Sequence, residues 1–260
     1  MAKIIAICNQ KGGVTKTTGT VNLGVGLALQ GKKILLVDLD AQADLTTALG
    51  WPDNDSLTIT LATTMERVIQ DEPVDPRDGI LHHCEGVALI PSNIELSGVE
   101  MSLVNAMNRE FILKNILDFI RSEYDYIIID CPPSLSMLTI KALAATDCVI
   151  VPVQAQYLPA KGMTQLMKTI AKVKKQINPS LTISGILMTL VDARTNLARV
   201  TEDTLRQQYG NILKIYETRI PVSVKAAESS AAGQSIFTYD PGSKVAEAYA
   251  ALCLEVLADA

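Results

Sequence analysis

The chain has 260 residues, of which 48% are hydrophobic and 4% aromatic, and its formal net charge is −5. This length and apolar content can form a substantial core and exclude wholesale disorder. No apolar run approaches the roughly 18 residues of a membrane span, and the N-terminal MAKIIAICNQ lacks the long apolar region of a secretion signal. We therefore expect a cytoplasmic protein.

Apolar strand-like runs alternate with helical periodicity along almost the whole chain. The predicted strands are 3–8, 33–38, 87–92, 124–130, 148–153, 183–191 and 212–221. The predicted helices are 16–30 (with Gly31 in the place of a C-terminal cap), 44–49, 58–70, 97–106, 109–122, 136–145, 162–176, 198–209 and 243–258. This order predicts an α/β fold with a doubly wound, mostly parallel sheet flanked by helices. We expect residues 1–260 to form a single domain, with 51–80 an irregular excursion on its surface.

The five cysteines are scattered singly, mostly inside apolar runs. Without a secretion signal they are expected to be reduced, buried thiols. The cluster His82-His83-Cys84 has no second ligand pair at zinc-like spacing, which favours a solvated loop over a metal site.

The stretch NQKGGVTKTT (9–18) follows the first predicted strand and opens the first predicted helix. Lys16 and Thr17 match the end of the phosphate-binding pattern G-x-x-x-x-G-K-[ST], but Gln10 and Thr15 occupy its two glycine positions. Strictly scanned, the pattern is absent, although its context of strand, turn and helix is present.

Two neighbouring glycines can supply what such a loop needs. Gly12 and Gly13 permit the backbone to curl its N–H groups around phosphate at a helix N-terminus. Lys16 would then reach the β- and γ-phosphates of a nucleotide, and the Thr17 hydroxyl would bind Mg²⁺. The stretch therefore predicts a nucleotide-binding loop.

Carboxylates follow two further predicted strands, at the sheet edge where ligands bind in open α/β folds. Asp38 and Asp40 come at the end of the second strand, where carboxylates can orient water or hold Mg²⁺ through water. The apolar run YIIID ends in Asp130 and has the form of a Walker B strand, whose aspartate supports Mg²⁺.

Four segments together, KGGVTKTT, VDLDAQADLT, IIIDCPPSLSMLT and DARTN, resemble the ParA/Soj chromosome- and plasmid-partitioning ATPases. These form a deviant Walker A (MinD-like) class of the P-loop NTPase fold, and the likeness runs across nearly the whole chain. The resemblance implies an ATPase of slow turnover that takes ATP and Mg²⁺ as cofactors and forms a homodimer on binding ATP. It also implies nonspecific DNA binding at the nucleoid, a ParB-type centromere-binding partner and a role in DNA segregation.

The resemblance also implies roles for individual residues. Lys11 matches the signature lysine that contacts the partner's nucleotide across an ATP-sandwich dimer, and Gly12 permits that close approach. The implied catalytic residues are Lys11, Lys16 and Asp40, with Asp40 positioning the attacking water. The implied Mg²⁺ ligands are Thr17, Asp40 and Asp130. The implied nucleotide contacts are Lys11, Gly12, Gly13, Val14, Thr15, Lys16, Thr17, Thr18 and Pro221.

Positive charge is concentrated in one part of the chain. Residues 161–225 hold 11 Lys or Arg against 4 Asp or Glu, a local charge of +7. The resemblance places DNA-binding cations at Arg194 and Lys225, and we add Arg219. A predicted helix face could extend this patch or be ordinary solvated surface; it carries Lys168, Lys172 and Lys175.

The chain departs from the family pattern at two positions. Thr15 replaces a glycine before the P-loop lysine, which would strain the loop if that residue needs an unusual φ and would then affect the hydrolysis rate. Val222 stands where the family often has an arginine.

Three alternative functions share some of these sequence features. Thr15 could leave a nucleotide-binding switch with little hydrolysis. A MinD-like membrane ATPase would need a basic amphipathic end, whereas the last residues carry Glu247, Glu255 and Asp259 against Lys244, so no membrane is expected. A nitrogenase-iron-protein-like electron carrier needs paired cysteines, and no second cysteine is evidently placed to join Cys131.

Overall fold

The computed structural model describes residues 1–102, 108–155 and 160–259. Within them the strands form one sheet in the order β3-β4-β2-β5-β1-β6-β7-β8. β3 (Leu81–His82) pairs antiparallel with β4 at one edge. The other strands are mutually parallel: β1 (Lys3–Ile7), β2 (Ile34–Asp38), β4 (Val87–Ile90), β5 (Tyr126–Asp130), β6 (Cys148–Gln154), β7 (Thr182–Val191) and β8 (Ile215–Pro221).

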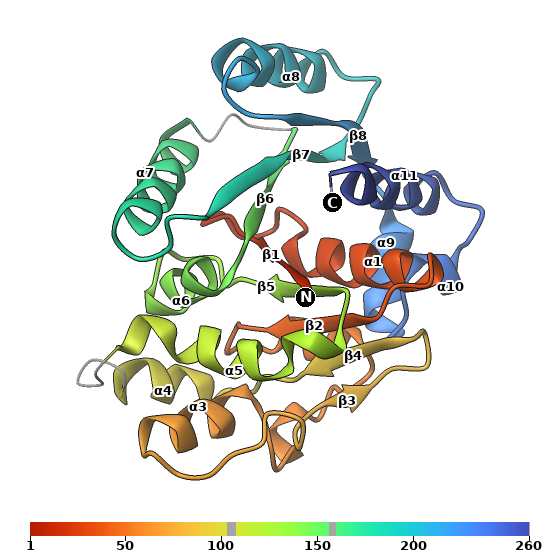
Figure 1. Cartoon of the computed structure of the whole chain (residues 1–260). Helices are drawn as coiled ribbons and strands as arrows, with labels where there is room; N and C mark the ends of the chain where they lie inside the picture. The colour runs from red at the N-terminus through yellow and green to blue at the C-terminus, as the bar shows by residue number, and fades with distance from the viewer. Residues whose placement is uncertain (103–107, 156–159, 260) are drawn as a thin grey trace.

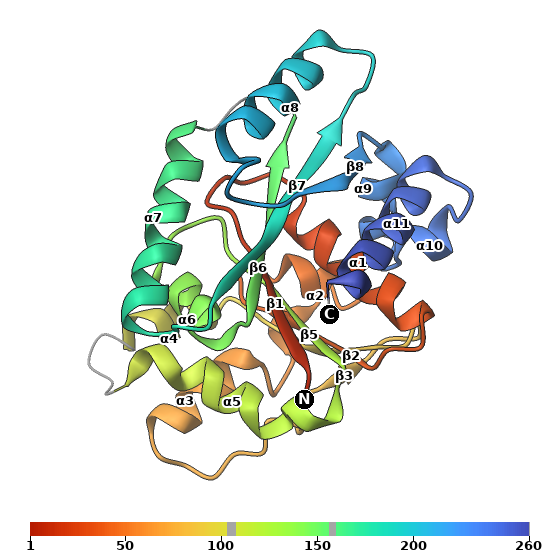
Figure 2. The same cartoon turned by 45° about the horizontal axis from the view of Figure 1, so that its top comes forward.

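Helices cover both faces of the sheet (Figures 1 and 2). One face carries α1 (Lys16–Leu29), α2 (Asp44–Ala48), α9 (Val224–Ala231), α10 (Ile236–Tyr239) and α11 (Lys244–Ala258). The other face carries α3 (Leu61–Ile69), α4 (Leu96–Ser102), α5 (Ile112–Ile120), α6 (Met137–Ala145), α7 (Ala160–Gln176) and α8 (Asn196–Tyr209). Short 3₁₀ turns occupy Asn54–Ser56, Arg109–Phe111 and Arg121–Glu123.

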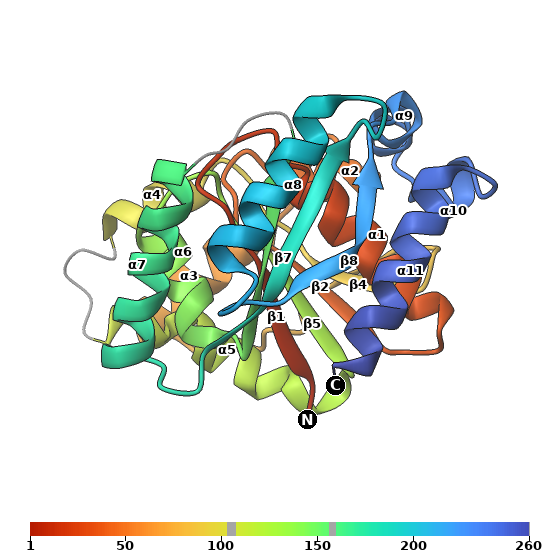
Figure 3. The same ribbon diagram turned by 90° about the horizontal axis from the view of Figure 1, so that it is seen from above.

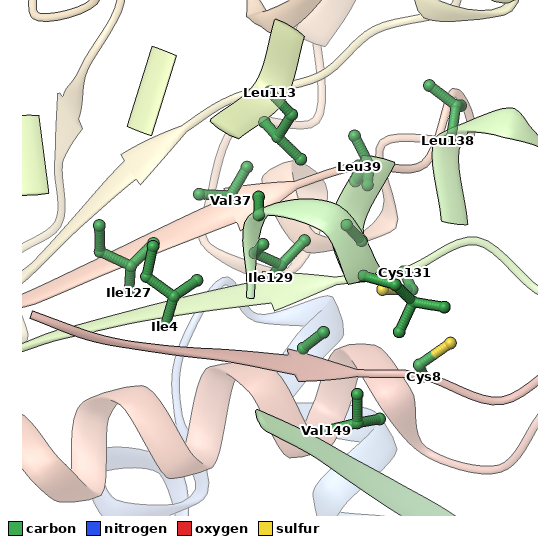
Figure 4. Close-up of a cluster of buried hydrophobic side chains, with 14 of the residues drawn as sticks. Ile4, Cys8, Val37, Leu39, Leu113, Ile127, Ile129, Cys131, Leu138 and Val149 are labelled. Carbon is green, nitrogen blue, oxygen red and sulfur yellow. The ribbon is translucent and has the colours of Figure 1, made fainter. Parts of the chain in front are cut away.

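Each central strand sends alternate side chains into two separate hydrophobic cores. In β1, Ile4 and Ala6 belong to the core under α3–α8, whereas Ile5 and Ile7 belong to the core under α1 and α11. Figure 4 shows the first core around Ile4. Burial on both faces explains why these strands read as continuous apolar runs.

The predicted doubly wound α/β fold is confirmed, and each of the seven predicted strands is present. The last strand begins at Ile215 rather than 212, because residues 210–213 form a turn in which Ile212 is 73% exposed. The predicted helices are present within the described residues, but the end of helix 97–106 lies outside them. Sequence reasoning missed the short elements β3, α9 and α10.

Two segments differ in detail from expectation. Residues 51–80 include α3, whose Leu61 and Met65 are fully buried, while most of the remainder is irregular. The predicted solvated loop at 82–84 is wrong for His83, whose side chain is largely buried and whose Nε2 lies 3.2 Å from the carbonyl oxygen of Gly233.

Helix α1 packs closely because two of its glycines face neighbouring elements. A Cβ atom at Gly24 would lie 2.6 Å from Leu36 Cδ2 on β2. One at Gly26 would lie 2.5 Å from Cys253 Sγ on α11 and 3.1 Å from the ring of Phe237. These contacts fix α1 between the sheet and α11, and thereby fix the loop from which α1 begins.

A buried carboxyl supports the end of β2. Asp38 is fully buried, and its Oδ2 accepts hydrogen bonds from Thr46 N (2.8 Å) and Thr46 Oγ1 (2.7 Å). Burial raises the pKa of Asp38 to about 7, against the opposing effect of these hydrogen bonds. Thr46 Oγ1 also accepts the N–H of Ser92, so one hydroxyl joins three segments.

We expect Gly26→Ala to lower the free energy of unfolding by about 1–3 kcal/mol, because the added methyl overpacks the contact with α11. Gly19→Ala, on the same helix, is the control. Its Cβ would meet only Ile7 Cδ1 at 3.9 Å, so stability should stay equal or rise by up to about 1 kcal/mol. Chemical denaturation measures both, and equal effects would contradict the packing argument.

We expect Thr46→Val to destabilise the fold by about 1–3 kcal/mol, because it removes a donor to a buried carboxyl and an acceptor for Ser92 N–H. Thr46→Ser keeps the hydroxyl and should cost less than about 1 kcal/mol, the value of one buried methyl. Urea unfolding compares the two variants, and equal losses would show that the methyl, not the hydroxyl, matters.

Candidate functional site

The segment between β1 and α1 is anchored to the ends of two other strands. Asn9 is buried, and its Nδ2 donates to the carbonyl oxygen of Pro152 on β6 (2.7 Å) while its Oδ1 accepts the N–H of Lys11 (3.0 Å). Thr189 Oγ1 on β7 donates to the carbonyl oxygen of Val14 (3.2 Å). The loop is therefore held in shape by contacts far apart in the sequence.

The loop turns through left-handed backbone at two positions. Gly13 has φ 71°, which a glycine adopts freely. Thr15 has φ 64° and ψ 32° and precedes the first residue of α1, with its carbonyl oxygen accepting Gly19 N–H (2.8 Å). A β-branched residue in this region is strained by of order 1–3 kcal/mol. Thr15 therefore does need an unusual φ.

The first turn of α1 brings Lys16 and Thr17 to the site. Lys16 is 8% exposed, and its Nζ donates to the carbonyl oxygen of Lys11 (3.3 Å), across the loop. Thr17 Oγ1 donates to Asp130 Oδ2 at the end of β5 (2.6 Å). The helix N-terminus thus meets the Walker B-like strand directly.

Asp130 is buried, and its second carboxylate oxygen, Oδ1, has no hydrogen-bond partner among the described residues. Burial raises the pKa of Asp130 well above its usual value, and the nearby Asp38 raises it further, against the effect of Thr17. A buried carboxylate with an unsatisfied oxygen beside a hydroxyl is a donor set that a hard cation such as Mg²⁺ would satisfy.

A cavity of about 350 Å³ opens beside these groups. Residues that the sequence predicted for the site line most of it: Gly12, Gly13, Thr15, Lys16, Thr17, Thr18 and Asp40. Sequence reasoning missed three further lining residues: Asp44, Cys131 and Pro133. Their positions within four residues after Asp40 or Asp130 were the available signal.

Three of the predicted nucleotide contacts are not among the residues that line the cavity. Val14 is buried beneath the loop. Pro221 ends β8, three strands from β1, and is not among the described residues that line the cavity. Lys11 lies beside the cavity, with its Nζ donating to Gln154 Oε1 at the end of β6 (2.9 Å).

Negative charge gathers along one side of the cavity. Asp40 is half-buried, and its Oδ1 accepts the N–H of Gln42 (3.1 Å). Burial raises the pKa of Asp44, Asp40 raises it further, and the charge of Lys16 lowers it. With Asp130, three carboxyl groups therefore adjoin one ammonium group, which favours an added cation.

In the described part of the chain, no cluster of three or more His, Cys, Asp or Glu side chains could hold a metal ion by itself. A cation at Thr17 and Asp130 would therefore need further oxygen ligands, such as water or the phosphates of a nucleotide.

No helix in the described ranges is both long and apolar enough to cross a bilayer.

The predicted DNA-binding cations are all paired with carboxylates. Arg194, after β7, is 90% exposed and makes two 2.9 Å hydrogen bonds to Asp192, which lower the pKa of Asp192 to about 2. Arg219 on β8 pairs with Glu202 of α8. In α9, Lys225 Nζ lies 3.0 Å from Glu228.

These pairs lie at the β7–β8 side of the sheet: one follows β7, one joins β8 to α8, and one lies in α9. Figure 3 shows β7 and β8 running toward the edge where α8 and α9 begin. The structure thus brings the three cations to one side of the molecule, but each is paired with an acid, and Arg219 shares Glu202 with Arg206.

Cys131 does have a second cysteine beside it, contrary to the sequence expectation. Cys8 follows β1 and Cys131 follows the adjacent β5, and their thiols interact (Figure 4). The contact with Cys8 and burial raise the pKa of Cys131 well above its usual value. Both thiols are buried inside one chain, so they do not form the exposed pair that a cluster between subunits requires.

Comparisons with known proteins agree with this geometry. The model of the AAA domain family matches residues 2–183. The chain is 44% identical to the sporulation initiation inhibitor protein Soj of Bacillus subtilis over 100% of both chains. It is 40% identical to the chromosome partitioning protein ParA of Myxococcus xanthus over 99% of this chain and 88% of that one.

A solved structure extends the likeness to three dimensions. The crystal structure of cobyrinic acid a,c-diamide synthase from Mycobacterium smegmatis, with bound ADP and magnesium, matches with a TM-score of 0.86. It is 36% identical in sequence, over 99% of this chain and 94% of that one. This match supports the P-loop NTPase fold, and the full-length relatives show that the chain belongs to the ParA/Soj family of partitioning ATPases.

Proposed function

We propose that residues 1–260 act as a single P-loop ATPase domain that binds ATP with Mg²⁺, dimerises on binding it and hydrolyses it slowly. The dimer binds DNA without sequence preference, at the nucleoid, and segregates chromosomal or plasmid DNA with a ParB-type centromere-binding partner. The observation that carries the proposal is the loop 9–18, which presents two lysines beside a threonine–aspartate pair. The family membership supports the same activity.

Two residues of the loop and two aspartates beside it have chemical tasks in this proposal. Phosphoryl transfer to water depends on positioning and charge neutralisation more than on covalent chemistry. Lys16 holds the phosphates, and Thr17 with Asp130 holds Mg²⁺, which neutralises charge that develops on the transferred group. Asp40, half-buried at the cavity wall, orients the attacking water and supports Mg²⁺ through water.

Lys11 makes hydrolysis depend on assembly. It is half-buried, directly precedes the exposed glycines Gly12 and Gly13, and bonds to a neutral amide of β6. In the ATP-sandwich dimer it contacts the nucleotide of the partner, while Gly12 allows the two faces to approach. Nucleotide state then acts as a switch on assembly.

DNA binding follows from dimerisation. Each protomer contributes Arg194, Arg219 and Lys225, and exposed ion pairs such as those of Arg194 and Lys225 stabilise the free protein by only about 0–1 kcal/mol. DNA phosphates can therefore displace the carboxylates. A dimer doubles the phosphate contacts, so affinity should rise with ATP and fall steeply with salt.

The decisive experiment is DNA retention with ATP, ADP and no nucleotide at two salt concentrations. We expect strong retention with ATP at low salt only. Equal DNA retention with ATP, with ADP and without nucleotide would contradict a nucleotide-dependent switch. Absence of phosphate release, with DNA and partner present, would indicate a nonhydrolysing switch, and sedimentation with liposomes in ATP would indicate a MinD-like activity.

Substitution of Asp40 and Lys11 separates hydrolysis from assembly. We expect Asp40→Ala to reduce phosphate release by about a hundredfold or more while leaving ATP-dependent dimers, because it removes the group that orients water. Lys11→Ala should lose both the dimer and hydrolysis. Light scattering and phosphate release measure these effects, and normal hydrolysis by Asp40→Ala would place the water-positioning role on another group.

Substitution of Arg194 tests the DNA-binding face. Arg194→Ala should weaken ATP-dependent DNA binding and reduce the slope of log affinity against log salt by about one per protomer, because one phosphate contact is lost. Arg77→Ala is the control, since this arginine is also exposed and paired with carboxylates but lies near β3 at the opposite edge. Unchanged binding by Arg194→Ala at moderate salt would refute the assignment.

A further inference from the structure

Helix α7 exposes a row of lysines on the side opposite its buried face. The side chains that it packs into the core are apolar: Met163, Leu166, Ile170 and Val173. Lys168, Lys172 and Lys175 recur at intervals of four and three residues and are exposed, so they form one lysine row along the outer face of the helix. Figures 1 and 2 show α7 at the outer edge of the molecule.

No acid neutralises the lysine row. Among the described residues, none makes a hydrogen bond or an ion pair with the side chain of any of its three lysines. The sequence explains this, because Asp147 is the only acidic residue between Asp130 and Asp192. Asp147 is itself paired with Arg121 (2.5 Å). The row therefore carries unpaired positive charge, unlike the three cations on the β7–β8 side of the sheet.

An unpaired lysine contributes more to the binding of a polyanion than a paired one. Its contact with a DNA phosphate releases a condensed counterion, and no carboxylate of the protein has to be displaced first. Lysine acts on phosphate as a flexible point charge, which suits contacts without sequence preference. From Lys168 to Lys175 the row spans about 10 Å, a length that faces about three phosphates of one DNA strand.

The outer face of α7 offers no apolar anchor for another kind of partner. Beside the lysines it exposes Gln165 and Ala171, and no large apolar side chain among the described residues of α7 is exposed. Protein–protein interfaces are anchored by aromatic and arginine side chains and are depleted in lysine. A helix that binds a membrane surface inserts its apolar face, whereas that of α7 is buried in the core. The row therefore fits a phosphate backbone best.

We propose that the outer face of α7 binds the phosphate backbone of double-stranded DNA through Lys168, Lys172 and Lys175. The proposal rests on DNA binding, as proposed above, but not on ATP binding or dimerisation, because one protomer contains the whole row. It extends the DNA-binding face beyond the paired cations of the β7–β8 side. A dimer presents the row twice.

The test is the binding of a labelled DNA duplex of mixed sequence to the full chain, between about 50 and 200 mM salt. Lys168→Gln/Lys172→Gln/Lys175→Gln should reduce the slope of log affinity against log salt by about 2–3 per protomer. Its affinity at the lowest salt should fall at least about tenfold. The corresponding triple arginine variant keeps the charges and should keep the slope of the parent. An unchanged slope in the glutamine variant would overturn the proposal.

A charge-matched control separates a local contact from the effect of net charge. Lys32, Lys33 and Lys244 also lack a side-chain partner among the described residues, and they lie before β2 and at the start of α11. Lys32→Gln/Lys33→Gln/Lys244→Gln removes the same charge and should leave the slope unchanged. An equal loss of slope in this control would show that only net charge matters, which would refute the α7 contact.

Chemical modification of lysine locates the contact directly. In the parent, bound DNA should slow the acetylation of the lysine row several-fold, measured by mass spectrometry, and leave Lys33 and Lys244 unchanged. Equal rates with and without DNA at the row would contradict the assignment. Poly-glutamate and anionic vesicles are the competing probes. Binding of either that is lost in the triple glutamine variant, with DNA binding retained, would assign the row to an acidic protein or to lipid instead.

The nucleotide dependence distinguishes this proposal from the proposed function. If DNA binding by the parent proves independent of nucleotide but the glutamine variant loses slope, the nucleotide-dependent switch is refuted and the α7 contact stands. If ATP-dependent binding is present and the glutamine variant matches the parent, the α7 contact is refuted and the switch stands. A parent that binds no DNA with ATP, with ADP or without nucleotide would refute both.

Discussion

The hydrogen bond from Thr17 to Asp130 is the contact on which the arrangement of the site depends. It joins the first turn of α1 to the end of β5, and it exists because β5 lies between β2 and β1 in the sheet. The same order places Asp38 and Asp130 opposite each other in register. Two buried carboxyl groups side by side repel each other when ionised. The two groups differ in the hydrogen bonds that they receive. Asp38 receives hydrogen bonds from Thr46 and the backbone. Asp130 instead retains one buried oxygen without a hydrogen-bond partner among the described residues, which a bound cation would satisfy.

Backbone strain is concentrated at the same edge of the sheet. Three non-glycine residues with positive φ follow or end strands there: Thr15 before α1, Ala43 before α2 and Leu190 near the end of β7. The other two within the described residues are Asp71 and Asn108, residue types that tolerate this region through local hydrogen bonds. Strain in alanine, leucine and threonine persists only where surrounding contacts impose it, as the hydrogen bond from Thr189 to Val14 does beside Thr15.

The sequence predicted what is local and missed what the sheet order decides. The central strands are buried on both faces, so they appear in the sequence as continuous apolar runs. Lys16, Thr17 and Asp130 could be predicted because they occur in short recognisable sequence patterns. β3 has two residues and α10 four, too few to show a period. The bonds Asn9–Pro152, Lys11–Gln154 and Val14–Thr189 span 143 to 175 residues, so no local pattern reveals them. The pairing of Arg219 with Glu202 likewise depends on how α8 packs beside β8.

The partners of the basic residues differ in a way that fits their proposed tasks. Arg194, Arg219 and Lys225 are neutralised by carboxylates on an exposed surface, where salt or phosphate can compete with the pair. Lys11 instead donates to the neutral side-chain amide of Gln154, which leaves its charge uncompensated by that partner. A carboxylate there would attract Lys11 strongly and would also repel the phosphates of an approaching nucleotide. A neutral acceptor orients the ammonium group at the exposed loop while preserving its attraction for phosphate, which is the property that a lysine acting across a dimer requires.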